Sequence, residues 1–529
     1  MKHLNVAPWI SVVLMLSAGL ILFQMLILAI DLGSKPEGAR WVGAHLVNTN
    51  DVAVYQAHLR QSAEASLIYS PYVLEPNTSR IDPFWFMGSV LVRTGLSPAW
   101  ANLVLRFFMT VILAVSIVLT ARWLRPQRIA STTLFLTSGL TTGWVVWVWY
   151  GFRQVPLTPQ TSPLDALEAS VPFSLLGGAH MVLSFALLLL AMRWVWQAIR
   201  APNFGRIFAA ACTMLALSSF HPYFIPLLAV MILISILQSI SLQTVKRLLG
   251  VGAALTAALL PATLYYGSLW LRPSVFGQHP IVVQVLTLPD LPIWIVTFLP
   301  ILGALIWMRL KRIPLDSEFA PWAIAWLLSV LVCALALPWR FKLLQGLSIP
   351  LVVLTLPVWD RIWDELRQQG QRILIPYAVL FLLFPFAVFV VQELRVSTDS
   401  ILQQRLFLPQ RVFVAWSWID QQPRKGFVLS TNPVINLWTP AATRHPVWIG
   451  HPHETPDFAY RWEGWSSWMQ QEDASAYLEF LDTHQITLLL LDTEAEQQRA
   501  KSYLSADWDL VFEDKGVQVW KRSSDPPSG

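Results

Sequence analysis

Long apolar segments without charge constrain this chain more than any other feature. Residues 207–245 form a run of 39 residues without Asp, Glu, Lys or Arg, and similar runs recur along most of the sequence. A helix needs about 20 such residues to cross the hydrocarbon core of a bilayer. The 529-residue chain is 13% charged, about half the fraction found in soluble domains. We therefore expect an α-helical polytopic membrane protein. Its net charge of +5 indicates basic anchors at a membrane surface and no nucleic-acid partner.

Eleven segments have the length and apolarity of transmembrane helices. The first, residues 9–30, has 22 uncharged residues, more than the roughly 7–15 of a signal-peptide core, and we expect it to remain uncleaved. The others lie at residues 101–121, 129–149, 172–192, 207–220, 222–240, 248–269, 291–308, 319–338, 343–359 and 373–391. The polar, proline-containing stretch "SSFHPYFIP" separates residues 207–220 from 222–240. These two segments form either a hairpin of two helices or one bent helix, which would reduce the count to ten.

Basic residues between the spans gather in alternate loops. The loops are residues 122–128, 193–206, 246–248, 309–312 and 360–372. The positive-inside rule places this side in the cytoplasm. With eleven spans, the extracytoplasmic side receives the loops 31–100, 150–171, 270–290 and 339–342 and everything after residue 392.

The C-terminal part differs in pattern from the rest. Short apolar runs such as "GFVLST", "PVWIG", "ITLLLLD", "DLVFED" and "GVQVWKR" predict strands, and "ASAYLEFLDTH" and "EAEQQRAKSYL" predict amphipathic helices. We expect a transmembrane domain over residues 1–392 and a small extracytoplasmic α/β domain over residues 393–529.

The first outside loop contains two predicted helices. "DVAVYQAHLRQSAEA" spaces Tyr55, His58 and Ser62 at helical intervals, which predicts a short helix along the surface. "DPFWFMGSVLVRTG" predicts a second interfacial helix, with residues 84–86 ("FWF") against lipid.

Charged side chains in the other outside loops each allow two interpretations. Asp165 and Glu168 are three residues apart just before a span, so they either complement a helix dipole or form one face of a site. Arg340 and Lys342 lie in "PWRFKLLQG", on the side where basic residues are disfavoured. They are either snorkelling anchors or a clamp for a lipid phosphate.

The histidines also allow two interpretations. His180 and His221, near the outer ends of spans, are either hydrogen-bonded structural residues or residues that line a site, because both lie on the same side of the membrane as Asp51 in the first outside loop. In "RHPVWIGHPHET", the residues His445, His451, His453 and Glu454 form either a polar loop that contacts an acceptor or a zinc site.

The layout as a whole resembles the GT-C superfamily of polytopic glycosyltransferases. The resemblance is carried by "NDVAVYQAHLRQSAEA", "PLDALEASVPFSLLGGAHMVLSFALLLL", "PWRFKLLQGLSIPL" and "TPAATRHPVWIGHPHETPD", which are similar to bacterial members of that family. It implies a GT-C-like fold in a bacterial inner (plasma) membrane. It also implies a polyprenyl-phosphate-linked sugar donor and a glycan, lipid or protein acceptor.

The same resemblance implies roles for individual residues. Asp51 corresponds to the acid of the first outside loop that acts as general base on the acceptor, and Tyr55 would form a wall of its pocket. Asp165 and Glu168 correspond to a pair that holds a divalent ion in some relatives, for which Mg²⁺ or Mn²⁺ would suit the oxygen ligands. The spacing here is D-x-x-E, where oligosaccharyltransferases have D-x-E.

Two other classes of protein remain as alternatives. A transporter or flippase for lipid-linked sugars would favour ionisable residues inside its spans and repeated halves, whereas here the carboxylates lie mostly in loops. A non-catalytic protein that kept the fold is the second alternative, because a fold does not establish an activity.

Overall fold

The computed structural model describes residues 8–46, 48–74, 79–138, 171–240, 245–271, 298–337, 343, 346–368, 374–452, 454–504 and 507–523. The chain divides into two compact units. Unit 1 comprises Met1–Ile27, Arg106–Gly267 and Ile281–Gln392, and unit 2 comprises Leu28–Leu105, Ser268–Pro280 and Glu393–Gly529. Unit 2 thus combines the first outside loop with the C-terminal region. The predicted boundary between residues 392 and 393 stays a prediction.

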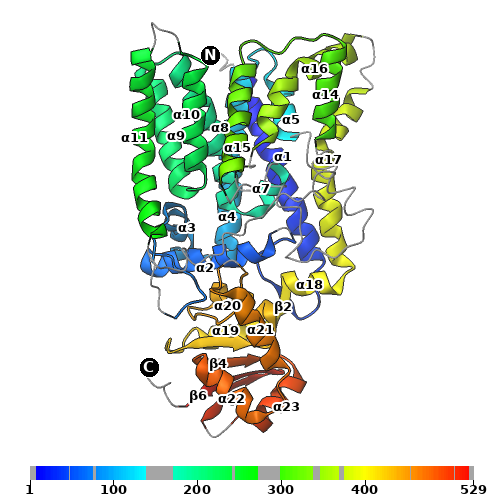
Figure 1. The fold of residues 1–529 in the computed structure, drawn as a ribbon. Coiled ribbons are helices and arrows are strands. Elements are labelled where there is room, and N and C mark those ends of the chain that lie inside the picture. The colour runs from blue at the N-terminus through cyan, green and yellow to red at the C-terminus, as the bar shows by residue number, and fades with distance from the viewer. Residues whose placement is uncertain are drawn as a thin grey trace, which may run out of the picture. The chain divides into compact units, whose positions relative to one another are not determined.

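Apolar helices account for the described part of unit 1 (Figure 1). Its helices, four of which continue into residues of unit 2, are α1 (Pro8–Gly33), α4 (Pro98–Leu124), α5 (Ile129–Ser138), α7 (Val171–Gly177), α8 (Ala179–Arg200), α9 (Phe204–Phe220), α10 (Phe224–Leu237), α11 (Val245–Trp270), α14 (Leu299–Leu310), α15 (Ala320–Ala336), α16 (Ser348–Gln368) and α17 (Leu374–Leu394). Each of the eleven predicted spans overlaps a helix of this set.

Four of these helices, namely α1, α4, α8 and α11, are long and apolar enough to cross a membrane by themselves. The chain is therefore an integral membrane protein, and the predicted number of eleven spans stays a prediction. The segment 207–240 forms two helices, since α9 ends at Phe220 and α10 begins at Phe224. The backbone angles of His221, φ −138° and ψ 80°, are not helical. Of the two interpretations, the structure therefore has two helices and not one bent helix.

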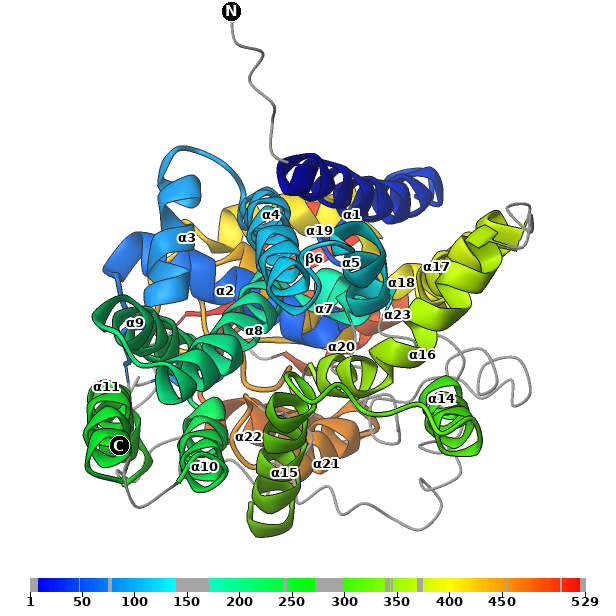
Figure 2. The same cartoon turned by 90° about the horizontal axis from the view of Figure 1, so that it is seen from above.

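Helix α8 lies at the centre of unit 1. Of its apolar window 72% is buried, compared with 33% for α1 and for α11. It contacts α9, α10 and α15, and in the view from above α9 and α10 lie beside it (Figure 2). The indole Nε1 of Trp322 on α15 donates to the Met192 carbonyl on α8 at 3.0 Å. This bond satisfies a buried indole N–H where the two helices meet.

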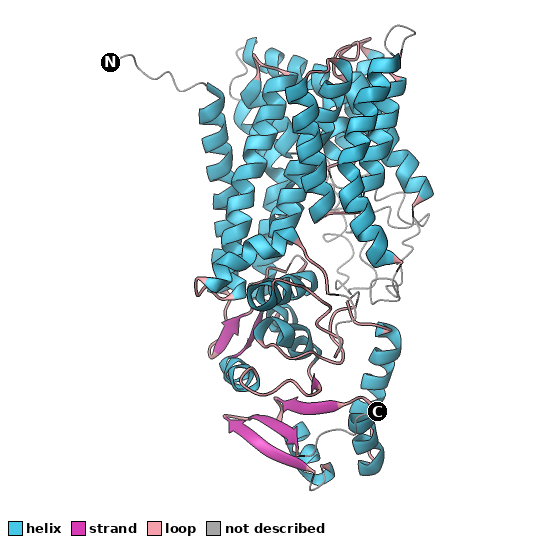
Figure 3. Ribbon diagram, turned by 90° about the vertical axis from the view of Figure 1, so that its left-hand side faces the viewer, coloured by secondary structure: helices cyan, strands magenta, loops and turns pink. Residues whose placement is uncertain are grey.

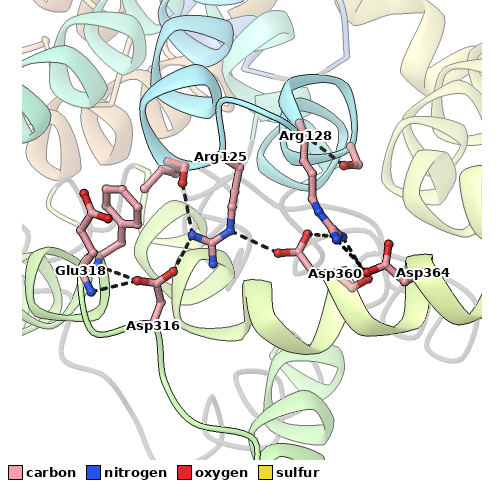
Figure 4. A network of polar contacts seen from close by, with 9 residues as sticks. Arg125, Arg128, Asp316, Glu318, Asp360 and Asp364 are labelled. Carbon is pink, nitrogen blue, oxygen red and sulfur yellow. Dashed lines mark hydrogen bonds and ion pairs between the residues drawn. The ribbon is translucent and has the colours of Figure 1, made fainter.

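An ion network joins three of the predicted cytoplasmic segments (Figure 4). Arg125, which follows α4, contacts Asp316 at 2.5 Å and Asp360 at 3.2 Å. Arg128 contacts Asp364 at 2.7 Å and Asp360 at 3.5 Å. These contacts join the segments after α4, before α15 and at the end of α16, and the predicted topology stays a prediction.

This network gives a pH dependence of stability. Burial raises the pKa of Asp316, but hydrogen bonds from Arg125 and from the backbone N–H groups of Phe319 and Glu318 outweigh it and hold the pKa below its usual 3.8. Stabilisation by a carboxyl with a lowered pKa is present above its unfolded pKa and is lost as the pH falls through the folded value. At pH 7, Asp316→Asn should lower stability by about 1 kcal/mol. In detergent, the difference in thermal stability from wild type should shrink as the pH falls below about 4. A difference independent of pH would contradict this account.

Unit 2 contains two separate sheets (Figure 3). Strand β1 (Ala39–Trp41) pairs antiparallel with β2 (Phe407–Pro409). The second sheet has the order β3-β4-β6-β5. Its strands are β3 (Phe427–Ser430), β4 (Ile486–Leu491), β5 (Trp508–Asp514) and β6 (Val517–Arg522). Strands β3 and β4 are parallel, and β6 is antiparallel to both β4 and β5.

The other elements that lie within unit 2 are helices, which precede and separate these strands along the sequence. They are α2 (Thr49–Ala65), α3 (Pro83–Arg93), η5 (Arg395–Ser397), α18 (Ser400–Leu406), α19 (Gln410–Ile419), α20 (Pro433–Ala442), α21 (Phe458–Met469), α22 (Ala474–Thr483) and α23 (Glu494–Tyr503). The predicted fold class is confirmed in outline: the chain is mostly helical, with several apolar helices and a small mixed sheet near its C-terminus. The strand predicted at residues 446–450 is wrong in extent. This segment makes one parallel bridge, between Val447 and Val428, and the Val447 N–H donates to the Pro71 carbonyl.

The first outside loop is more buried than its sequence predicts. Helices α2 and α3 form as expected, and α2 packs against both α3 and α20. Phe84 and Trp85 are 1% and 4% exposed, so the expectation that they face lipid is wrong. Asp82 caps α3 by accepting from the N–H groups of both residues. This cap satisfies two N–H groups of the first turn of α3, in which both residues are buried. Phe86 is 45% exposed, as expected.

Candidate functional site

Asp51 lies in the first turn of α2, where its carboxylate accepts hydrogen bonds from two other side chains. The Tyr55 hydroxyl, one turn along the helix, donates to Oδ2 at 3.2 Å. His451 Nε2 lies 2.8 Å from Oδ1. His451 is 400 residues away in sequence but belongs to the same unit. The Asp51 side chain is 28% exposed and His451 is 4% exposed. The carboxylate is therefore held in one orientation and still reaches solvent.

A backbone hydrogen bond determines which ring nitrogen of His451 carries the proton. The Glu454 N–H donates to His451 Nδ1 at 3.2 Å, so Nδ1 is an acceptor. The neutral imidazole then carries its proton on Nε2, which faces Asp51. His451 thus donates to the carboxylate, so each oxygen of Asp51 accepts one hydrogen bond. A carboxylate oriented in this way is suited to accept a proton from a hydroxyl group.

Aromatic rings enclose the other side of Tyr55. Its ring stacks on Trp85 with centroids 5.3 Å apart and an interplanar angle of 24°. His58, one turn further along α2, lies 5.8 Å from the same indole. Burial, and then the nearby Arg80 and His451, hold the pKa of His58 well below its usual value. Tyr55 and Asp51 are thus supported by a neutral, largely apolar wall.

The loop that carries His451 is closely packed against the segment after α2. A Cβ at Gly450 would lie 2.3 Å from Cε1 of Tyr72, which is fully buried. The Ser70 hydroxyl donates to the Glu454 carbonyl at 2.7 Å, and Val447 N–H donates to the Pro71 carbonyl at 3.1 Å. Tight packing of this kind fixes the position of His451 relative to α2.

The other two candidate histidines come together in unit 1. The rings of His180 and His221 stack with centroids 5.2 Å apart and an interplanar angle of 11°. His180 lies in the first turn of α8, after Gly178, which has φ 149° and interrupts the helix. His221 occupies the break between α9 and α10. The structure therefore pairs two residues that the sequence only placed on one side of the membrane.

Four candidate residues lie outside the described part of the chain. They are Asp165, Glu168, Arg340 and Lys342. Their assignments as metal ligands and as substrate-binding residues stay predictions.

A possible metal site among the described residues is formed by a different set. Ligand atoms of Asp31, His45 and Glu393 lie within 4.8 Å of one another, and all three residues are buried. His445 contacts the Gln422 carbonyl at 3.1 Å, and His451 contacts Asp51. His453, the other histidine of the suggested zinc site, lies outside the described residues.

Trp85 and Arg106 were not identified from the sequence as members of a site. His451 was named there as part of a loop that contacts an acceptor or of a zinc site, without its link to Asp51, and Trp85 was expected to face lipid. Arg106, only 2% exposed, lies in α4 and donates to the Leu176 carbonyl at 3.2 Å. The sequence did contain a signal for Arg106, because it is the one charged residue in the predicted span 101–121. Ionisable residues inside spans commonly mark functional positions.

Comparisons with known proteins give only distant likenesses. No protein-family model matches the chain, and no curated protein matches it. It is similar to the crystal structure of ArnT from Cupriavidus metallidurans bound to undecaprenyl phosphate, at 14% identity and a TM-score of 0.47, over 95% of this chain and 98% of that chain. The apo structure of the same protein matches at 16% identity and a TM-score of 0.44, with 95% and 97% covered.

An archaeal structure is similar to the same degree. The Archaeoglobus fulgidus oligosaccharyltransferase in complex with zinc and sulfate matches at 12% identity and a TM-score of 0.44, over 95% of this chain and 73% of that one. At these identities and scores, the likenesses carry no argument about what this chain does.

Proposed function

We propose that the chain is a membrane glycosyltransferase that transfers a sugar from a polyprenyl-phosphate carrier to an acceptor on the extracytoplasmic face. The observation that carries this proposal is the Asp51 carboxylate, oriented by Tyr55 and His451 and still 28% exposed. The apolar helices are long enough to hold the chain in a bilayer, which is where a lipid-linked donor is found. The sequence resemblance to GT-C enzymes supplies the class of reaction.

The reaction assigns a simple task to Asp51. An acceptor hydroxyl attacks the anomeric carbon of the sugar, the bond from that carbon to the phosphate oxygen breaks, and the polyprenyl phosphate leaves with the bonding electrons. The acceptor loses its proton to the Asp51 carboxylate as the new bond forms. Tyr55 and His451 touch Asp51 and are positioning residues in this scheme, because each fixes one oxygen of the carboxylate.

The direct test is transfer by the full-length protein. The purified chain in detergent or lipid nanodiscs is incubated with radiolabelled polyprenyl-phosphate sugars and with membrane glycans, lipids or peptides as acceptors. Label should move to one acceptor class, and only from a matching donor. Absence of transfer from every donor, with donor binding retained, would favour a non-catalytic or transport-type protein.

We predict that Arg340 contributes to donor binding as a phosphate clamp. Arg340→Ala should weaken the binding of a polyprenyl-phosphate donor by about 10-fold or more, because a charge-assisted contact to phosphate is lost. The measurement is donor affinity in a protein whose thermal stability is unchanged. Arg340→Lys keeps the charge but loses the paired donors of the guanidinium group. Its affinity for the donor should lie between that of the wild type and that of Arg340→Ala. Normal affinity in a well-folded Arg340→Ala protein would leave Arg340 as an anchor only.

A further inference from the structure

A pocket of unit 2 is lined by three arginine residues. Arg60 comes from α2, Arg424 from the segment before β3, and Arg444 from the segment after α20. These segments are distant in the sequence but belong to the same compact unit. The enclosed space is about 10 Å³, which is close to the room that one water molecule needs. A pocket of this size accepts a terminal group of a ligand and not a whole sugar ring.

Ion pairs and hydrogen bonds hold two of the guanidinium groups in place. Arg60 Nη2 donates to Asp420 Oδ2 at 2.5 Å, and Arg60 Nη1 donates to the Ala442 carbonyl at 2.7 Å. Arg60 Nε lies 3.5 Å from Glu64 Oε1. Arg444 Nη2 donates to the Asp420 carbonyl at 2.7 Å, and its Nε lies 3.5 Å from Asp420 Oδ1. Arg60 is thus fully occupied by protein partners and forms part of the frame, whereas Asp420 orients Arg444.

An aromatic residue holds the third guanidinium group. Arg424 Nη1 donates to the Tyr69 hydroxyl at 2.9 Å, and its guanidinium carbon lies 5.6 Å from the centre of the Tyr69 ring. Within the described residues, Arg424 Nε and Nη2 and Arg444 Nη1 make no hydrogen bond. Both side chains are exposed, so these donors are accessible to a ligand. Gln61 Oε1 accepts from the Tyr69 N–H at 3.1 Å, which leaves the amide NH₂ of Gln61 as a further donor in the lining.

The pocket carries a positive net charge. Its lining contains the three guanidinium groups and one carboxylate, that of Glu64, and Asp420, which contacts two of the arginines, adds a second carboxylate. Three positive and two negative charges leave +1. Burial, and to a smaller degree the charge of Arg424, lowers the pKa of His445 in the lining. Its imidazole is therefore neutral at pH 7 and does not change this balance.

We infer that this pocket binds an anionic oxygen group, a carboxylate or a phosphate, at the end of a small ligand. Nε and Nη2 of Arg424 lie on one edge of the guanidinium plane, and such a pair of donors matches two oxygens of one carboxylate or phosphate group. Arg444 Nη1 and the Gln61 amide are further donors for the same group. The single positive net charge of the pocket would be balanced by the charge of the ligand.

This pocket is separate from the carboxylate of Asp51. Arg60 follows Asp51 by nine residues on α2, which is roughly 14 Å along the axis at a rise of 1.5 Å per residue. At about 100° per residue, the two side chains also leave opposite sides of the helix. The inference therefore does not depend on the proposed function.

The test uses the full-length protein in detergent, with inorganic phosphate and glucuronate as probes. At an ionic strength kept constant with chloride, at least one probe should raise the thermal unfolding temperature with a saturable dependence, because a ligand that binds the folded state stabilises it. A response to phosphate identifies a phosphate group, and a response to glucuronate but not to glucose identifies a carboxylate carried by a sugar. An unfolding temperature that neither probe changes would overturn the inference.

Variants tell this pocket from any other anion site in the protein. Arg424→Gln removes the paired donors and should weaken the affinity for the active probe by about 10-fold or more. Arg40→Gln is the matched control, because Arg40 is an exposed arginine of the same unit that also lies over an aromatic ring, that of Phe413, at 4.7 Å. This control should bind the probe as the wild type does. Unchanged affinity in Arg424→Gln would place the anion elsewhere and would contradict the inference.

Discussion

Asp51→Asn should lower sugar transfer by about 10²–10⁴-fold, the usual contribution of a general base. The asparagine side chain has nearly the shape of aspartate but cannot accept the acceptor's proton. Its amide oxygen can still accept from His451, and its amide nitrogen can donate to the Tyr55 hydroxyl oxygen, so insertion and folding should be little changed. The measurement is the transfer rate at saturating donor, together with the thermal stability of the purified variant.

Two further variants sharpen this prediction. Glu64→Gln makes the same chemical change on the same helix, at a side chain 42% exposed and paired only loosely with Arg60, and it should transfer at the wild-type rate. His451→Gln should slow transfer in the wild-type background and add little to Asp51→Asn, because its effect passes through Asp51. If Asp51→Asn transferred sugar normally, the assignment of the base would be wrong.

Gly450→Ala should destabilise unit 2 by about 1–3 kcal/mol, the usual cost of overpacking a well-packed core. The added Cβ would lie 2.3 Å from Cε1 and 2.9 Å from Cζ of Tyr72. The Tyr72 ring is fully buried, so either the ring or the loop must move. Because His451 is the next residue, transfer should also fall. Thermal unfolding and transfer rate measure the two effects.

Gly464→Ala is the control for this change. A Cβ at Gly464 would lie 3.4 Å from Cη2 of Trp448, within ordinary contact distance. Gly464 lies inside α21, where alanine is favoured over glycine by about 0.5–1 kcal/mol. This variant should therefore be as stable as wild type or more so. Equal effects of the two substitutions would contradict the packing described for the His451 loop.

Local sequence patterns predicted most of the secondary structure. Helix α2 and the break at His221 followed from periodicity and from a proline-containing polar stretch, both of which are properties of neighbouring residues. The same holds for strands β3 to β6 and for helices α22 and α23. The patterns were less reliable for burial. Trp85 was expected to face lipid because aromatic residues favour interfaces, but α2 covers it in the folded chain.

The partners of each candidate residue were not predictable in the same way. Asp51 could be selected through the resemblance to GT-C enzymes, which points to an acid in the first outside loop, whereas its bond to His451 joins residues 400 positions apart. Arg340 and Asp165 were also selected from their places in outside loops. Both lie outside the described residues, so their roles stay predictions.

The sequence by itself determined that this chain is a helical membrane protein with a mixed α/β region near its C-terminus, because apolar length and periodicity act locally. Only the tertiary structure decided that the first outside loop and the C-terminal region form one compact unit. It also brought His451 to Asp51, and Glu393 to Asp31 and His45. Such contacts depend on how distant segments pack, and a polar side chain in a loop gives no signal of the partner it will meet after folding.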